Sequence, residues 1–261
     1  MSKWRPVPTD NLYAVSDIHG QLDQLQLICS RIFPLRKSDG IKDRAVFLGD
    51  YIDRGPKSPE VVDFLIAAKK KYKDQLILLC GNHELMLLDA LKPSVNSDDY
   101  LMWMRNGGES TLSQYLDRGN NHLDNPYELM RNRVKDFIPK DHLDFFISLL
   151  PYYEFENYIF VHGGCNPAEP LNKQSISQLV WDRDLFDFAK RNPNNLSWDK
   201  TIVTGHNGFE RDHPYISQKF LMLDCSYNHK LISIELNSME CFVAGKNKDK
   251  LVKLELRPLV F

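Results

Sequence analysis

The sequence lacks a strong excess of charge, a long apolar run and paired cysteines. Its 33 lysine and arginine residues balance 35 aspartate and glutamate residues, so we expect neither nucleic acid nor an anionic membrane as its partner. No apolar stretch approaches the length of a membrane-spanning helix, and the first residues lack the apolar run of a signal peptide. The five cysteines include no Cys-x-x-Cys pair, which argues against a disulfide framework and favours a cytoplasmic protein. Export by a route that needs no cleaved signal stays open.

The composition is that of an ordinary folded protein. Hydrophobic residues make up 43% of the chain and charged residues 26%, which excludes a disordered chain, a collagen-like chain and a coiled coil. The 261 residues would suffice for one large domain or two small ones. Because no stretch has the composition of a linker, we predict a single domain over residues 1–261.

The apolar pattern predicts an α/β fold of two sheets with outer helices. Strands are expected at residues 12–15, 44–48 and 75–80, with helices at 21–33 and 59–72 between them, and this order implies a largely parallel sheet. A helical insertion is expected over about 84–150, with a break at the Asn106-Gly107-Gly108 segment and a helix over 127–137. Strands return at 152–155, 158–161 and 201–204, and the stretches 220–223, 231–236, 241–244 and 251–256 predict consecutive antiparallel strands.

Five polar clusters each follow directly after a predicted strand. They are Asp17-Ile18-His19-Gly20, Gly49-Asp50-Tyr51-Ile52-Asp53-Arg54-Gly55, Gly81-Asn82-His83-Glu84, His162-Gly163-Gly164 and Gly205-His206. The carboxyl ends of strands in an open α/β sheet share one edge, where ligands bind. We therefore expect clusters that are far apart in the sequence to meet in space.

The side chains that would meet are of the types that ligate metal ions. They are Asp17, His19, Asp50, Asn82, His162 and His206. Carboxylates combined with imidazoles suit manganese, iron, zinc or cobalt better than calcium or magnesium. They are too many for one ion that keeps an open position, and enough for two ions if one carboxylate bridges them. Each motif alone is common in surface turns, so the prediction depends on their joint occurrence.

In this order and spacing, the five clusters resemble the signature of the phosphoprotein phosphatase family of calcineurin-like metallophosphoesterases. The resemblance spans about residues 12–225. Trp103-Met104-Arg105-Asn106-Gly107-Gly108 and Trp181-Asp182-Arg183 are similar to elements of the bacterial and phage branch, near the phage lambda phosphatase. The family fold that the resemblance implies is a sandwich of two mixed sheets flanked by helices, in four αββα layers.

The resemblance also implies roles for single residues, carried over by motif position. One divalent metal ion would be held by Asp17, His19 and Asp50. Asp50 would bridge to a second ion, which would be held also by Asn82, His162 and His206. Manganese is the expected metal, with iron or zinc as alternatives. A hydroxide that bridges the two ions would attack phosphorus directly.

Four further residues receive roles in the same way. His83 is similar to the family's general acid, and Asp53 to the carboxylate that partners it. Arg54 and Arg183 resemble arginines that bind the substrate phosphate. Glu84 is assigned no catalytic role, because a carboxylate at a helix start is favourable in itself.

The function that the resemblance implies is metal-dependent phosphoprotein phosphatase activity on phosphoserine or phosphothreonine, with phosphotyrosine open. One alternative is a hydrolase of dinucleoside polyphosphates such as diadenosine tetraphosphate. Another, of a different class, is a catalytically inactive scaffold that binds a partner. The family often has Gly-His-Thr where this chain has Gly205-His206-Asn207, and Asp-Thr-Gly where it has Asp224-Cys225-Ser226. These departures remove no expected ligand and concern the loops beside the second metal.

Overall fold

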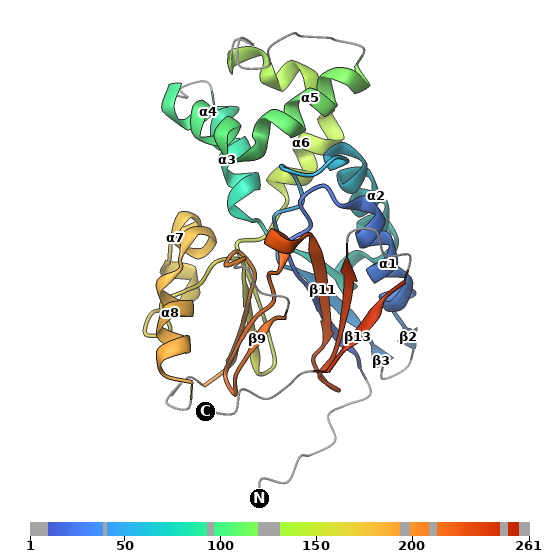
Figure 1. The fold of residues 1–261 in the computed structure, drawn as a ribbon, viewed down its shortest axis with the longest axis vertical. Coiled ribbons are helices and arrows are strands. Elements are labelled where there is room, and N and C mark those ends of the chain that lie inside the picture. The colour runs from blue at the N-terminus through green and yellow to red at the C-terminus, as the bar shows by residue number, and fades with distance from the viewer. Residues whose placement is uncertain are drawn as a thin grey trace, which may run out of the picture.

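Two β-sheets lie face to face between layers of helices (Figure 1). The computed structural model describes residues 10–38, 41–92, 97–119, 131–193, 199–208, 213–245 and 250–255. None of the helices in these ranges is long and apolar enough to cross a lipid bilayer. The predicted pair of mixed sheets with flanking helices is confirmed.

The first sheet combines a parallel half with an antiparallel half. Its strands, in spatial order, are β13 (Val252–Leu254), β12 (Glu240–Gly245), β11 (Lys230–Glu235), β1 (Leu12–Val15), β4 (Arg44–Phe47) and β5 (Leu76–Leu78). β1, β4 and β5 run parallel, as the alternation of strands and helices predicted, while β11 pairs antiparallel with β1. The ends of three parallel strands are therefore placed at one edge.

The second sheet brings two further strand ends to the same region. Its strands, in spatial order, are β6 (Tyr152–Phe155), β7 (Tyr158–Val161), β8 (Thr201–Thr204), β10 (Phe220–Met222) and β9 (Tyr215–Ile216). The prediction that β10 belongs to the consecutive antiparallel strands is wrong, because β10 pairs parallel with β8 in the second sheet. An apolar run shows that a strand is buried without showing which strand lies beside it.

Alternation along the strands divides the core into layers. Leu12 and Ala14 of β1 pack between the two sheets against Val203 of β8, whereas Tyr13 and Val15 face the helices on the other side. Successive side chains of a strand point to opposite faces. Each sheet thus has one face in the central core and one face against helices.

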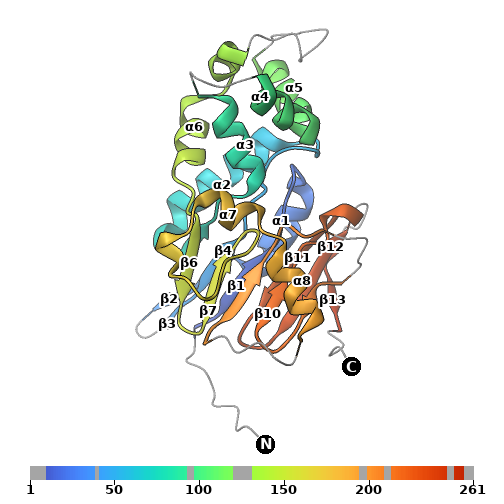
Figure 2. The ribbon, with the colours of Figure 1, turned by 90° about the vertical axis from the view of Figure 1, so that its left-hand side faces the viewer.

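Helices cover the outer face of each sheet (Figure 2). The first sheet is covered by α1 (Leu22–Ile32) and α2 (Ser58–Tyr72), and the second by α7 (Ile176–Trp181) and α8 (Asp184–Arg191). The sequence pattern predicted α1 and α2 but neither α7 nor α8. The six residues of α7 are too few for a helical period to stand out. In α8 the buried Leu185, Phe186 and Ala189 do lie at helical spacing, so this helix was predictable from its sequence.

A helical cap stands above the strand ends, at the top of Figure 1. It contains α3 (Asn82–Ala90), α4 (Ser97–Trp103), a π-helical segment (Met104–Gly108), α5 (Glu109–Arg118) and α6 (Lys140–Ile147). Of the helix expected over 127–137, the described part is a 3₁₀ helix, Arg131–Phe137. Further 3₁₀ turns are Lys73–Gln75, Leu171–Lys173 and Ser226–Asn228, and β2 (Lys37–Ser38) pairs antiparallel with β3 (Ile41–Lys42).

The expected break at Asn106-Gly107-Gly108 is confirmed as a kink between α4 and α5, within the segment Met104–Gly108. Gly107 adopts φ 114° inside it, a conformation that a residue without Cβ reaches at little cost. A Cβ at Gly107 would lie 2.7 Å from Cγ of Arg54 and 2.9 Å from its backbone nitrogen. This glycine therefore allows the cap to approach the loop that follows β4.

Candidate metal centre and active site

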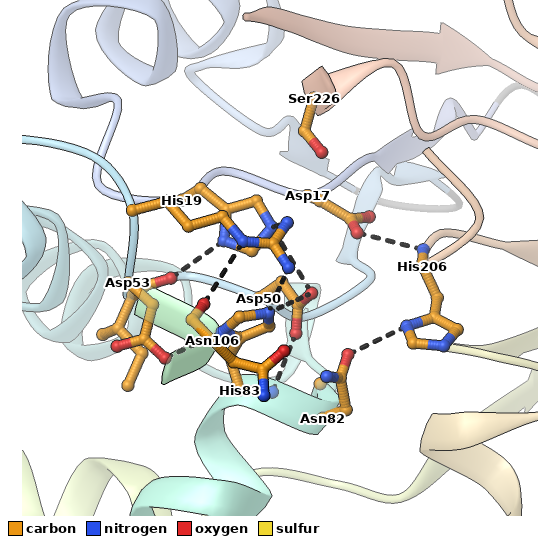
Figure 3. Close-up of polar contacts among 12 residues, drawn as sticks. Asp17, His19, Asp50, Asp53, Asn82, His83, Asn106, His206 and Ser226 are labelled. Atoms are coloured by element: carbon orange, nitrogen blue, oxygen red, sulfur yellow. Dashed lines mark hydrogen bonds and ion pairs between the residues drawn. The ribbon is translucent and has the colours of Figure 1, made fainter. Parts of the chain in front are cut away.

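Five strand ends deliver the expected metal ligands to one place. Asp17 follows β1, Asp50 follows β4, and Asn82 begins α3 after β5, while His162 and His206 follow β7 and β8. With His19, these six side chains are at most 7% exposed. Figure 3 shows Asp17, His19, Asp50, Asn82 and His206 around a common centre. The predicted convergence of these six residues is observed.

Asp50 lies between two groups of ligand-type atoms. Its Oδ2 is 3.5 Å from Nε2 of His19, and its Oδ1 is 3.3 Å from Nε2 of His162. Two sets, His19–Asp50–His83 and Asp50–His162–His206, each bring their ligand-type atoms within 4.8 Å of one another. A carboxylate shared by two sets is the arrangement that a bridged pair of cations requires.

The side-chain oxygen of Asn82 completes the second group. Its Oδ1 lies 3.0 Å from Nε2 of His162 and 2.8 Å from Nδ1 of His206. This amide oxygen thus contacts one imidazole nitrogen of each histidine, and Nε2 of His162 in turn lies 3.3 Å from Oδ1 of Asp50. These are nitrogen and oxygen donors of the kind that first-row divalent metals accept.

Backbone carbonyls set the tautomers of two histidines. Nδ1 of His19 donates to the carbonyl of Ile52 at 3.0 Å, and Nδ1 of His162 donates to that of Leu48 at 2.8 Å. A histidine whose Nδ1 carries the proton presents the lone pair of Nε2, as metal-binding histidines commonly do. In both residues this nitrogen faces Asp50.

Two buried atoms of the site have no hydrogen-bond partner within the described part of the chain. They are Oδ1 of Asp17 and Nε2 of His206. The other oxygen of Asp17, Oδ2, accepts a hydrogen bond from the backbone nitrogen of His206 at 3.0 Å. Buried polar atoms are nearly always paired, since leaving one unpaired is costly. Cations at this position would satisfy both atoms, so the donor set fits a metal centre.

Burial and neighbouring charges shift the pKa values of the site. Burial, followed by the charge interaction with His83, lowers the pKa of His19 to about 3. Burial, followed by the charge interaction with His162, lowers the pKa of His206 to about 2. Both imidazoles are therefore neutral at physiological pH and keep a lone pair for a metal. Burial and then Asp224 raise the pKa of Asp17 well above its usual value. A positive charge at the centre would counter this and favour the ionised carboxylate.

The backbone of the site is held in an uncommon conformation. His19, Asp50, Asp53, Arg54 and His206 have φ between 44° and 71°, in the left-handed region. Such values cost residues other than glycine free energy and persist only where the surroundings enforce them. Five candidate functional residues in this region indicate that the loops are shaped for the site.

Glu84 enforces part of this shape. One of its carboxylate oxygens accepts hydrogen bonds from the backbone nitrogens of Asp50 at 2.9 Å and Gly81 at 3.0 Å. The other accepts from those of Tyr51 at 2.7 Å and Ile52 at 3.3 Å. The helix-start role predicted for Glu84 describes only the bond to Gly81. The additional role, fixing the loop that carries Asp50, has no signal in the sequence apart from the motif itself.

We expect Glu84→Gln to lower the free energy of unfolding by about 2–3 kcal/mol, because a buried carboxyl group that accepts from four backbone N–H groups would be lost. The amide nitrogen of glutamine would also face backbone N–H donors. Urea unfolding at a fixed metal concentration measures the change. The exposed Glu169→Gln serves as the matched control and should change stability by less than about 0.5 kcal/mol. Equal stability of the two variants would contradict the role of Glu84.

His83 and Asp53 form a buried pair beside the six ligands. Nδ1 of His83 lies 2.7 Å from Oδ2 of Asp53, and both side chains are at most 1% exposed. Its other nitrogen, Nε2, lies 3.9 Å from Oδ2 of Asp50. Since Nδ1 donates to Asp53, Nε2 is the atom that faces the centre.

Two arginines border the centre from different sides. Arg54 is exposed, and its guanidinium lies 3.0 Å from Nε2 of His19 and 2.9 Å from Nε2 of His83. Arg183 donates to Oδ1 of Asn207 at 3.2 Å, a bond that the departure from Gly-His-Thr makes available. Both arginines line one cavity of about 460 Å³ with Asp17, Asp50 and Asn82. A polyanion in this cavity would meet a guanidinium on either side.

The cavity also reveals residues to which the sequence assigned no role. Asp224, Trp181 and Tyr227 line it. Asp224 is 2% exposed, and its charge contributes to the raised pKa of Asp17. The Trp181 ring contacts that of His206 edge-on, with ring centroids 5.8 Å apart. Asp224 lies in the second departure from the family pattern, which was the available signal for it.

A family model described as calcineurin-like phosphoesterase matches residues 11–233. The match covers most of the chain and every residue of the centre. The chain belongs to the calcineurin-like phosphoesterase family. Members of this family use divalent metal ions, and the shared Asp50 with its two histidine sets suits a binuclear site in this calcineurin-like phosphoesterase. The predicted family is confirmed.

Curated relatives of this calcineurin-like phosphoesterase include protein phosphatases. Shewanella-like protein phosphatase 1 of Plasmodium berghei is 29% identical over 174 residues, covering 64% of this chain and 42% of the relative. The serine/threonine-protein phosphatase 4 catalytic subunit of Kluyveromyces lactis is 45% identical over 69 residues, covering 26% of this chain and 20% of the relative. The matched parts span less than half the length of these two relatives.

Solved structures share the fold of this calcineurin-like phosphoesterase. A provisionally assigned diadenosine tetraphosphatase has a TM-score of 0.59 at 18% identity, with 94% of this chain and 97% of the other covered. A cold-active protein-tyrosine phosphatase of a psychrophilic Shewanella species has a TM-score of 0.56 at 20% identity, with 96% and 83% covered. At these identities the likeness shows the fold alone.

Proposed function

We propose that this protein is a metal-dependent phosphomonoesterase that hydrolyses phosphoserine and phosphothreonine in proteins. The single observation that carries the proposal is the buried His83–Asp53 pair at 2.7 Å beside six converging ligand-type side chains. An inactive scaffold would have no need for both. The protein phosphatases among its curated relatives support phosphorylated protein as the substrate. The expected cytoplasmic location and single-domain organisation stay predictions.

Two divalent cations would be held by the six buried ligands. Asp17, His19 and Asp50 would hold one, and Asp50, Asn82, His162 and His206 the other. When bound, such a pair polarises phosphoryl oxygens and makes a water molecule acidic enough to act as a nucleophile near neutral pH. We propose manganese, with iron or zinc as alternatives, because carboxylates and imidazoles are mixed.

His83 would supply a proton to the departing oxygen of the substrate. Its Nδ1 is engaged by Asp53 and its Nε2 faces the centre, so this nitrogen can reach a leaving group there. Asp53 would hold the ring in one orientation, with Nε2 directed at the leaving group. A proton delivered at this atom lets an alkoxide, otherwise a poor leaving group, depart as an alcohol.

Arg54 and Arg183 would bind the phosphate. Both line the cavity, and a guanidinium offers a planar fork of donors that matches phosphate oxygens. Arg54 reaches over His19 and His83, so a phosphate that it holds would lie between the ligand cluster and the proton donor. Charge neutralisation and positioning would supply most of the rate acceleration.

The test is a side-by-side assay of the manganese-loaded protein. A phosphoserine peptide, the matched phosphotyrosine peptide and diadenosine tetraphosphate are compared by kcat/KM. We expect the phosphoserine peptide to be the best substrate by roughly tenfold or more, since about 1.4 kcal/mol of differential transition-state binding suffices for that ratio. A clear preference for diadenosine tetraphosphate would replace the proposal with a nucleotide hydrolase. No turnover of any of the three, with metal bound, would favour the scaffold.

A further inference from the structure

Residues 103–111 of the helical cap contact the His83–Asp53 pair, and none of the roles above uses this contact. Thr111, at the start of α5, makes two hydrogen bonds to Asp53. Its hydroxyl accepts from the backbone nitrogen of Asp53 at 2.8 Å and donates to the carboxylate Oδ1 at 2.7 Å. The hydroxyl thus ties the carboxylate of Asp53 to the backbone of the same residue.

Trp103 adds a second donor to the same carboxylate. Its indole Nε1 lies 3.1 Å from Oδ2 and 3.3 Å from Oδ1 of Asp53. Trp103, Thr111 and Asp53 are all fully buried, at 0% exposure. A buried indole N–H and a buried carboxylate both need hydrogen-bond partners, and here the indole of Trp103 donates to the carboxylate of Asp53.

These contacts fix the direction in which Asp53 points. Asp53 has φ 71°, a conformation that a residue with a side chain avoids unless its surroundings enforce it. Thr111 satisfies Oδ1 and Trp103 spans both oxygens, which leaves Oδ2 directed at Nδ1 of His83. A turn of the carboxylate about its bond to Cβ would break these hydrogen bonds together.

The same segment also positions the next residue. The carbonyl of Gly107 accepts from the backbone nitrogen of Arg54 at 3.3 Å, and the carbonyl of Asn106 accepts from Nε of Arg54 at 3.4 Å. Figure 3 shows Asn106 beside Asp53 and His83. The cap therefore contacts both the partner of the proton donor and the phosphate-binding arginine.

We propose that Thr111, with Trp103, is a positioning residue that holds Asp53 so that His83 presents Nε2 to the leaving group. The inference rests on the proposed function, because it assumes that His83 donates a proton to the departing oxygen. It assigns a mechanistic role to residues 103–111 of the cap, none of which is a proposed metal ligand. A purely structural role of Thr111 would instead affect all substrates alike.

The test uses two aryl phosphates that differ in their need for a proton donor. Phenyl phosphate releases a weakly acidic phenol, whereas p-nitrophenyl phosphate releases a far more acidic one that leaves readily as an anion. We expect Thr111→Val to lower kcat for phenyl phosphate by roughly tenfold or more, as the loss of an orienting hydrogen bond commonly does. We expect kcat for p-nitrophenyl phosphate to fall by less than about threefold and KM to stay nearly unchanged for both.

The substitution is chosen so that the fold survives. Valine has nearly the shape of threonine, and Oγ of Ser58 lies 3.2 Å from the backbone nitrogen of Asp53, so this donor keeps an acceptor. Thr111→Ser restores the hydroxyl and should restore kcat for phenyl phosphate. Trp103→Phe removes the indole donor and keeps a large ring, and should show the same selective loss. Thr204→Val is the matched control, because Thr204 is equally buried and its hydroxyl has no partner among the described residues.

Each result decides between the roles. Selective loss on phenyl phosphate in Thr111→Val, with rescue by Thr111→Ser and no change in Thr204→Val, supports the inference. Equal losses on both substrates, or no loss, would overturn it while leaving the phosphatase proposal intact. A wild-type protein that hydrolyses neither aryl phosphate nor the phosphoserine peptide would overturn the proposed function itself. Metal content, measured for every variant, separates loss of positioning from loss of the metal.

Discussion

Replacement of Asp50 by asparagine is expected to remove metal and phosphoester hydrolysis together. Asp50 is the residue common to both ligand sets, with its two oxygens 3.5 Å from His19 and 3.3 Å from His162. Changes to residues that merely orient metal ligands already cost about 10- to 100-fold in affinity or activity. Loss of the shared charged ligand should therefore lower kcat/KM by more than roughly 100-fold. Metal content by atomic emission and turnover of p-nitrophenyl phosphate measure the two effects.

The control for Asp50→Asn is the same change at an exposed position. Asp23→Asn removes a carboxylate whose side chain is 78% exposed and pairs with Lys57 at the surface. Surface ion pairs contribute little, so this variant should keep its metal and its activity. If Asp50→Asn retained two equivalents of metal with normal turnover, the shared-ligand arrangement would be wrong.

Replacement of His83 by asparagine is expected to leave the metal in place and to lower kcat for a phosphoserine peptide by about 10²- to 10⁴-fold. The reason is that general acid catalysis matters most when an alkoxide must leave. The loss with p-nitrophenyl phosphate should be smaller, since its leaving group needs no proton. Steady-state kinetics with both substrates, together with metal content, make the measurement.

The metal content of the His83 variant is decisive, because His83 belongs to one of the two ligand sets. The atoms of His19, Asp50 and His83 lie within 4.8 Å of one another, as those of a metal site would. Loss of one equivalent of metal would make His83 a ligand and remove it as the proton donor. The exposed His213→Asn controls for the loss of an imidazole elsewhere and should change neither quantity.

The sequence predicted the position of the centre because the signals were local. Each polar cluster directly follows a short apolar strand, and parallel pairing of β1, β4 and β5 then brings Asp17, Asp50 and Asn82 to one edge. The ligand types are few and chemically distinct, so six dispersed residues can be grouped by their chemistry and by their place after a strand. The general arrangement of two sheets with outer helices followed from the same pattern, whereas their mixed strand direction was implied by the family resemblance.

Features that depend on distant partners were not predictable in this way. Thr111 is an ordinary helical residue in the sequence. Its role depends on a hydrogen bond from its hydroxyl to Asp53, which lies 58 positions away in the chain. Glu84 was predicted as a helix-start residue, and its bonds to the loop after β4 depend on how that loop folds back. The partner of β10 likewise depends on tertiary packing, which apolar alternation does not encode. Single-residue propensities contain no information about such pairs.

The left-handed backbone at His19, Asp50, Asp53, Arg54 and His206 has a consequence for how this protein can change. At these five positions glycine is the residue that the backbone would accept most readily, and a longer side chain raises the energy of the folded state. The functional side chain at each of these positions therefore lowers the stability of the folded protein relative to glycine. Stability and function compete at these five positions. Selection for higher stability alone would favour glycine there and would remove the functional side chains.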